Sequence, residues 1–76
     1  MIKLLIKIQI KLGFTDTEMA TTLNVSRAWW NFLKNGKQHI TDKVARKAYN
    51  AFKNDARLPK EIREKLQNIF LTNNHT

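Results

Sequence analysis

The fold of this chain follows from residues 14–36, which read FTDTEMATTLNVSRAWWNFLKNG. Thr15 and Glu18 have the spacing of a capping box, in which each side chain accepts a hydrogen bond from the other residue's backbone N–H. Phe14 and Met19 flank this pair at the positions of a hydrophobic staple. These four residues predict that a helix begins directly after Thr15.

A second helix is predicted to begin a few residues later. Asn24 tolerates the left-handed backbone that ends a helix, and Ser26 is a favourable N-cap for the next one. Gly36 is a typical C-cap residue, so we expect this helix to end just before it. Ala20 is small and lies at the centre of the first helix, which allows the two helices to cross closely. The stretch thus predicts a helix-turn-helix over about residues 15–36.

The second of these helices carries the candidate binding face. Its period turns Trp30 and Leu33 inward and leaves other side chains outward or near the outer face. With the N-cap, these are the candidate partner-binding or DNA-binding residues: Ser26, Arg27, Ala28, Trp29, Asn31, Phe32 and Lys34. Exposed aromatic residues such as Trp29 and Phe32 are more typical of a protein-binding hot spot than of a row that reads bases. They could instead be core residues of a slightly rotated helix.

The remaining sequence predicts three further helices. Residues 2–12 fit either an alternating strand or an amphipathic helix, and the lack of a partner strand favours the helix. Thr41 or Asp42 caps a fourth helix, and Pro59 lies in the first turn of a fifth. We therefore predict a single all-α, five-helix domain spanning residues 1–76, with the last few residues disordered. Its predicted core consists of Leu5, Ile8, Met19, Ala20, Leu23, Trp30, Leu33, Val44, Ala48, Ile62 and Leu66.

The composition argues against an enzyme. The chain has 76 residues, no cysteine and two isolated histidines, His39 and His75. A domain of this size has little room for a cleft with a cofactor, and the sequence contains neither a disulfide framework nor a metal-ligand cluster. It also pairs no nucleophile with a base and no carboxylate with another. We expect no catalytic residue, no metal and no cofactor.

The charge distribution predicts an anionic partner. The formal net charge is +8, and most of the excess lies in residues 27–53, which contain seven Lys and Arg residues but one acid, Asp42. A polyanion should approach this third of the chain. Beside a helix-turn-helix such side chains typically follow phosphates, although they could be only a solvated helix face. The candidate phosphate-binding residues are Lys37, Lys43, Arg46 and Lys47.

The apolar N-terminus does not fit a targeting or membrane segment. Lys3, Lys7 and Lys11 interrupt it at every turn, so no apolar run reaches the length of a signal peptide or a membrane span. A basic helix that lies on a membrane surface is a further alternative, which the folded-domain signals downstream disfavour. We expect a cytoplasmic protein with no membrane partner.

The helix-turn-helix resembles that of the Cro/CI-type phage repressors, the XRE family. The matching positions, without gaps, are Ala20, Leu23, Val25-Ser26, Trp30, Leu33 and Asn35-Gly36. With Gly13-Phe14-Thr15 and the two later helices, the similarity covers about residues 5–70. It implies a phage-repressor-like domain with a recognition helix at roughly residues 26–35. It also implies a set of DNA contacts: phosphate at Ser26, base edges at Arg27 and Ala28, and the groove face further along at Asn31 and Phe32.

Three features depart from that family's pattern. Asn24 stands at a turn position that is usually Gly, which is a tolerable exchange. Asp16 stands where the family commonly has Gln, and an acidic side chain there should repel a phosphate. Trp29 and Phe32 stand where polar base-reading residues are usual. We therefore expect weak, salt-sensitive binding to duplex DNA with poor sequence specificity.

In size, charge and sequence character the chain is also similar to the small modulator-of-repression (MOR) antirepressors, which are encoded beside the CI repressor in temperate phages of lactic-acid bacteria. That similarity implies that the protein binds the N-terminal domain of the cognate phage CI repressor inside the bacterial host cell and changes which promoters are silenced. The alternative is a Cro-like repressor that binds operator DNA through the same helix.

The two alternatives differ in what they require of oligomeric state. An operator reader of this class needs a two-fold dimer with its recognition helices roughly 34 Å apart, whereas an antirepressor does not. The sequence leaves a homodimer open. Several apolar side chains near the termini could either thicken the core or make a self-contact: Ile2, Ile6, Ile10, Phe70 and Leu71.

Overall fold

The computed structural model describes residues 1–73, which form five helices. In chain order these are α1 (Ile2–Leu12), α2 (Asp16–Leu23), α3 (Arg27–Lys34), α4 (Asp42–Phe52) and α5 (Lys60–Asn73). This part of the chain contains no strand, so the prediction of an all-α, five-helix fold is confirmed, including a helix over residues 2–12. The predicted disorder of the last few residues concerns residues 74–76, which lie outside the described residues.

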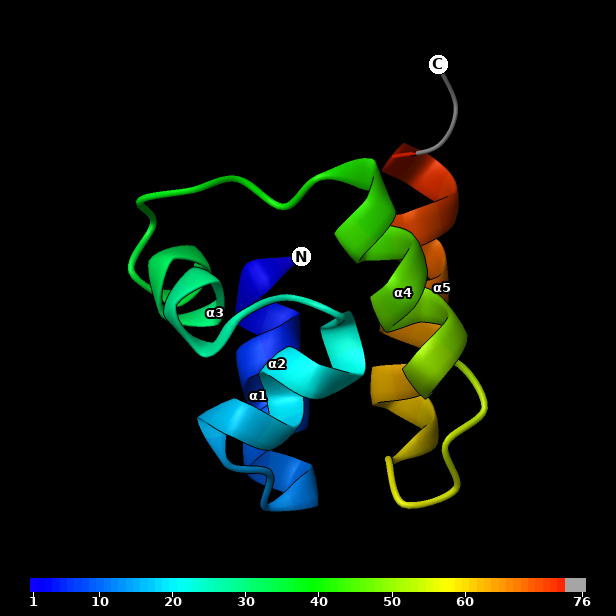
Figure 1. Ribbon diagram of the computed structural model, residues 1–76. Helices are drawn as coiled ribbons and strands as arrows, with labels where there is room; N and C mark the ends of the chain where they lie inside the picture. Colours follow the sequence, from blue (N-terminus) through cyan, green and yellow to red (C-terminus); the bar gives the residue numbers. More distant parts are fainter. Residues whose placement is uncertain (74–76) are drawn as a thin grey trace.

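The helices form two layers with α3 at one edge. In Figure 1, α2 and α4 lie in front of α1 and α5, and α3 lies at the left beside α1 and α2. The molecule is accordingly flat, with extents of 31 × 28 × 17 Å. Because α3 packs against its neighbours on one side only, its opposite side is open to solvent.

The first three helices all end at or beside a residue with a left-handed backbone. Gly13, Asn24 and Gly36 have φ angles of 68°, 59° and 74°. In each case the N–H of the next residue donates a hydrogen bond to the carbonyl five residues earlier: Phe14 to Gln9, Val25 to Ala20, and Lys37 to Phe32. This is the Schellman arrangement, which satisfies carbonyls that a helix end leaves free. The helix-ending role predicted for Asn24 is confirmed, whereas α3 ends one residue earlier than expected, with Asn35 as its C-cap.

The predicted helix starts are also present. The Thr15 hydroxyl accepts from the Glu18 N–H at 3.1 Å and the Glu18 carboxylate accepts from the Thr15 N–H at 2.9 Å, which completes the capping box. The Ser26 hydroxyl caps α3 and the Thr41 hydroxyl caps α4. Pro59 lies directly before α5 and not in its first turn as predicted, and its carbonyl accepts from two N–H groups of that turn. Local capping rules thus fix where these helices begin.

Every residue of the predicted core is buried. The core also contains Leu4, Phe52 and Leu58, of which Leu58 lies in the connection between α4 and α5. Around it pack partly buried apolar side chains: Met1, Ile2, Ile6, Leu12, Phe14, Val25, Trp29, Ile40 and Ile69. The stripe of Ile2 and Ile6 therefore thickens the core.

The other apolar side chains near the termini behave differently from this stripe. Ile10 is 74% exposed and Leu71 is 54% exposed. Phe70 stacks on Tyr49, with the ring centroids 4.2 Å apart. None of the helices formed by residues 1–73 combines the length and the apolar character needed to cross a membrane.

Candidate interaction face on α3

The inner side of α3 is fixed by two buried side chains and a polar network. Trp30 and Leu33 are 0% and 1% exposed, which confirms the prediction that both point inward. The indole Nε1 of Trp30 donates a hydrogen bond to Asp16 Oδ1 at 3.2 Å. A buried indole N–H usually needs such an acceptor, and here α2 supplies it. Trp30 therefore sets the rotation of α3 about its own axis.

Asp16 connects three helices through one carboxylate oxygen. Its Oδ1 accepts from Gln9 Nε2 at 2.9 Å, from Trp30 Nε1 at 3.2 Å and from Lys34 Nζ at 2.7 Å. The hydrogen bond from Gln9 and the hydrogen bond and charge of Lys34 lower the pKa of Asp16 from 3.8 to about 2. The carboxylate is therefore ionised at neutral pH and ties α1 and α3 to the start of α2.

This network corrects one expectation about charge, namely that Lys34 points outward. Instead the Lys34 side chain folds back to Asp16 and is only 25% exposed. Its ammonium lies 5.9 Å from the centroid of the Trp30 ring, so its stem follows the buried indole rather than leaving the helix. The two charges largely compensate each other beside the outer side of α3.

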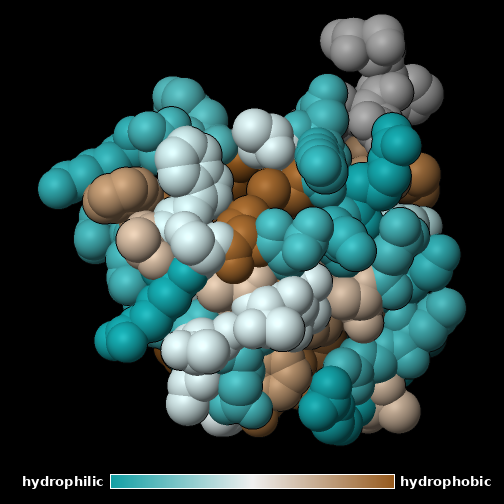
Figure 2. Space-filling model, viewed as in Figure 1, coloured by the Kyte–Doolittle hydropathy of each residue, from teal (hydrophilic) through white to brown (hydrophobic). Residues whose placement is uncertain are grey.

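The outer side of α3 carries an aromatic pair. Phe32 is 40% exposed, whereas Trp29 is half-buried and packs against the core. Their rings meet edge to face, with centroids 6.3 Å apart. Arg27 and Ala28 are exposed beside them. Figure 2 shows hydrophobic residues at the surface in the region of α3. Of the two expected aromatics, Phe32 lies on the surface and Trp29 supports it.

Most polar side chains of α3 and its N-cap have partners within the protein. The Ser26 hydroxyl accepts from the Trp29 N–H at 3.0 Å. Asn31 is half-buried, and its amide donates to the carbonyl of Arg27 at 3.1 Å. With Lys34 bound to Asp16, the remaining cation on this helix is Arg27. The outer side of α3 is thus mainly apolar, with one charged side chain at its beginning.

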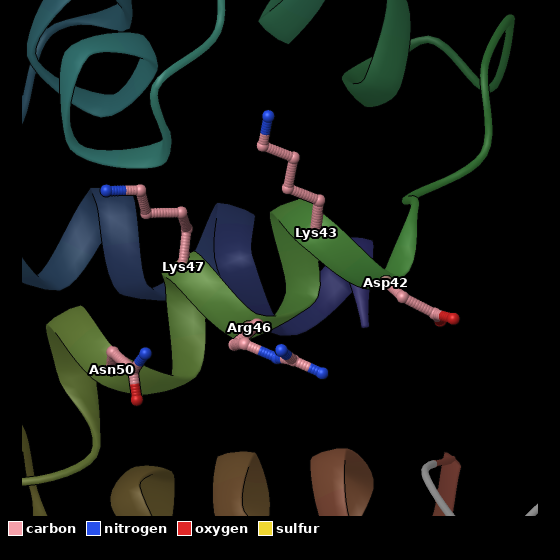
Figure 3. Close-up of a pocket in the computed structure, with 5 residues that line it drawn as sticks. All are labelled: Asp42, Lys43, Arg46, Lys47 and Asn50. Atoms are coloured by element: carbon pink, nitrogen blue, oxygen red, sulfur yellow. The ribbon is translucent and has the colours of Figure 1, made fainter.

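The phosphate-binding candidates lie beyond α3. Lys37 follows its C-terminus, and Lys43, Arg46 and Lys47 lie on α4; all four are exposed. The ion pairs within residues 1–73 involve other side chains, so these four carry uncompensated charge. A surface hollow of about 420 Å³ is lined by Asp42, Lys43, Arg46, Lys47 and Asn50. Figure 3 shows Lys43 and Lys47 pointing to one side of α4 and Asp42 pointing away from them.

The sequence did not predict the role of Gln9 or the partners of Asp16. The available signal was the indole N–H of Trp30, which needs an acceptor once the ring is buried. Nothing in the sequence specified that this acceptor would lie 14 residues earlier, or that Lys34 would share it from 18 residues away.

No family model, curated protein or solved structure matches the chain. Within residues 1–73, no three His, Cys, Asp or Glu side chains gather as a possible set of metal ligands.

Proposed function

We propose that this protein is an antirepressor in a phage genetic switch. It binds the N-terminal domain of the cognate CI repressor through the outer side of α3 and so alters promoter repression. The observation that carries the proposal is the exposed Phe32 ring held against the half-buried Trp29. The choice of partner comes from the similarity to the modulator-of-repression antirepressors.

The aromatic pair has the properties of a binding hot spot. Aromatic rings bury a large apolar area when they enter a pocket, and they lose few rotatable bonds on binding. Trp29 already packs against the core, so part of the ordering cost is met before the partner arrives. Arg27 and Lys37 are exposed near the two ends of α3, where charges orient an encounter without supplying most of the affinity.

The polar groups of α3 support a protein partner over an operator. Base recognition needs free donors and acceptors at the groove face. Asn31 already donates one amide N–H to the carbonyl of Arg27, and Lys34 donates to Asp16, so each has fewer free donors for a base and a side-chain direction set by its existing partner. An apolar pocket needs no free donor or acceptor from α3. Moving the Phe32 ring from water into such a pocket also gives more binding free energy than placing it against phosphates or base edges.

Binding through this surface has a regulatory consequence. The side of α3 that would contact the repressor is the same side that a helix-turn-helix protein inserts into the major groove. Repressor and operator would therefore compete for α3, and the complex would lose any DNA binding that depends on this helix.

A Cro-like repressor is the second candidate. The observation that favours it is the group of exposed cations beside α3, namely Lys37, Lys43, Arg46 and Lys47. Such side chains could follow phosphates on either side of a groove, and each contact would release condensed counterions and steepen the salt dependence of binding.

Co-purification with the cognate CI-type repressor tests the proposal. Operator binding is then measured for each protein alone and for the two together. We expect a stable complex with altered operator binding, and only weak, salt-sensitive DNA binding by this chain alone. A tight, sequence-specific operator complex formed by this chain alone, with no repressor complex, would contradict the proposal and favour the Cro-like alternative.

A further inference from the structure

A second basic surface lies on α1 and α5, away from the α3 face. Lys3, Lys7 and Lys11 recur every four residues on α1 and are all exposed. One α-helical residue advances 1.5 Å, so neighbouring lysines are about 6 Å apart along the axis. Lys65 of α5 adjoins this row, because it lines two surface hollows together with the α1 lysines. We call these four side chains the lysine row.

Two neighbouring hollows define the surface that the lysine row borders. One, of about 470 Å³, is lined by Lys7, Lys11, Pro59, Glu61, Ile62 and Lys65. The other, of about 310 Å³, is lined by Met1, Lys3, Leu4, Lys7, Lys65 and Ile69. Lys7 and Lys65 belong to both, so the two hollows form one continuous strip between α1 and α5.

The charges of the lysine row have no counter-ion within residues 1–73. The three ion pairs there are Lys34–Asp16, Arg57–Asp55 and Lys60–Glu64. Helix α1 contains no acidic residue, and Glu61, the one acid of the two hollows, makes no ion pair with the row. Like charges four residues apart destabilise a helix. The arrangement thus costs stability and leaves a strip of positive charge free for a partner.

We infer that the lysine row is a second binding surface and that it binds the phosphate backbone of duplex DNA. Regularly spaced point charges on a straight helix suit a partner with regularly repeated negative charge, which a duplex presents along its whole length. Lysine needs no fixed approach angle to contact a phosphate. Such contacts depend little on sequence, so this surface gives position and affinity but no base specificity.

An anionic membrane is the less suitable partner for the same charges. A helix that lies on a membrane must bury an apolar side among the lipids. The apolar side of α1, formed by Leu4, Leu5 and Ile8, is buried in the core. Ile10 is the one strongly exposed apolar residue of the helix, and a single side chain gives little insertion.

The lysine row shares no residue with α3 or with the basic side chains of α4. It does not depend on the proposed function, and the two could act together. A chain whose α3 holds a protein would still have α1 and α5 free to contact DNA. The protein could then keep a bound repressor near the DNA.

Acetylation footprinting of the full chain with a mixed-sequence DNA duplex at low salt tests this inference. Mass spectrometry reads the modification of each lysine with and without DNA. We expect Lys3, Lys7, Lys11 and Lys65 to be protected by the duplex. Lys60 lies on the same helix as Lys65 but pairs with Glu64, and it should change little. Protection confined to Lys37, Lys43 and Lys47, or no DNA binding at low salt, would overturn the inference.

The variant K3Q/K7Q/K11Q gives a second readout, and it should fold because all three side chains are exposed. The slope of log affinity against log salt should become shallower by roughly 0.9 for each lysine that contacts a phosphate. K43Q/R46Q/K47Q removes the same charge from α4 and should leave the footprint on α1 intact.

An unchanged slope in the first variant would overturn the inference. So would protection of the row by phosphatidylglycerol vesicles but not by DNA. Repressor binding through α3 should be unaffected by K3Q/K7Q/K11Q, so the two proposals can fail separately.

Discussion

Asp16 is one side chain that links α3 to both α1 and α2. Its carboxylate accepts hydrogen bonds from side chains of α1 and α3. The variant Asp16→Asn removes the charge of this side chain and keeps its shape. We expect this variant to lose about 1 kcal/mol of unfolding free energy at neutral pH. This is the magnitude for charge-assisted bonds after allowance for the solvent screening of a partly exposed pair. Urea unfolding measures the difference.

The same variant predicts a pH dependence of stability. Folding lowers the pKa of Asp16 from 3.8 to about 2. The contribution of this carboxylate to the unfolding free energy is therefore complete when the pH is above the unfolded-state pKa, and it disappears as the pH falls through about 2. The gap between wild type and Asp16→Asn should therefore close on acidification. Equal stability at neutral pH, or a gap that does not change with pH, would show that the network contributes no stability.

Between helices, the crossing of α2 with its neighbours depends on Ala20. This residue is 2% exposed on α2, which packs against both α3 and α4. Ala20→Leu should lower the unfolding free energy by about 1–3 kcal/mol, because extra methylenes in a filled core force the helices apart. Thr21→Leu places the same side chain at the next, exposed position and should cost little. Thermal unfolding of the two variants compares them, and wild-type stability in Ala20→Leu would contradict this packing.

The helices could be predicted from the sequence where local rules decide them. Thr15, Ser26 and Thr41 cap helices because of what stands within three residues of each, and the core follows from the helical period. Leu58 was missed because its burial depends on the path of a loop. A loop has no helical period, so the neighbouring residues do not indicate which side chain points inward. Trp29 could not be assigned because it lies at the border between the inner and outer sides of α3.

The candidate site was harder to predict than the fold. The partners of Asp16 lie 7, 14 and 18 residues away along the chain, so their meeting depends on how three helices pack. The same contacts decide whether Lys34 belongs to the outer surface. Composition and spacing therefore predicted the candidate helix and its buried side, but could not predict which of its side chains are free.

For the molecule as a whole, the distribution of exposed apolar residues predicts a monomer. Within residues 1–73 the large exposed hydrophobic side chains are Ile10, Phe32 and Leu71, which lie on three different helices. Separate side chains do not make the contiguous apolar patch that a stable dimer buries. Sedimentation equilibrium should give the mass of one chain even at high concentration. A tight two-fold dimer would instead fit the geometry of a Cro-like operator reader.

The measurement that tests the central proposal most directly is the affinity of Phe32→Ala for the N-terminal domain of the cognate CI repressor. Phe32 is exposed, so its truncation should leave the fold intact, which circular dichroism checks. Leu71→Ala truncates another exposed apolar residue away from α3 and serves as the control. We expect Phe32→Ala to lose about 2 kcal/mol or more of binding free energy, roughly 30-fold in Kd, and Leu71→Ala to bind like wild type. Wild-type affinity in a folded Phe32→Ala variant would contradict the assignment of α3 as the repressor-binding surface.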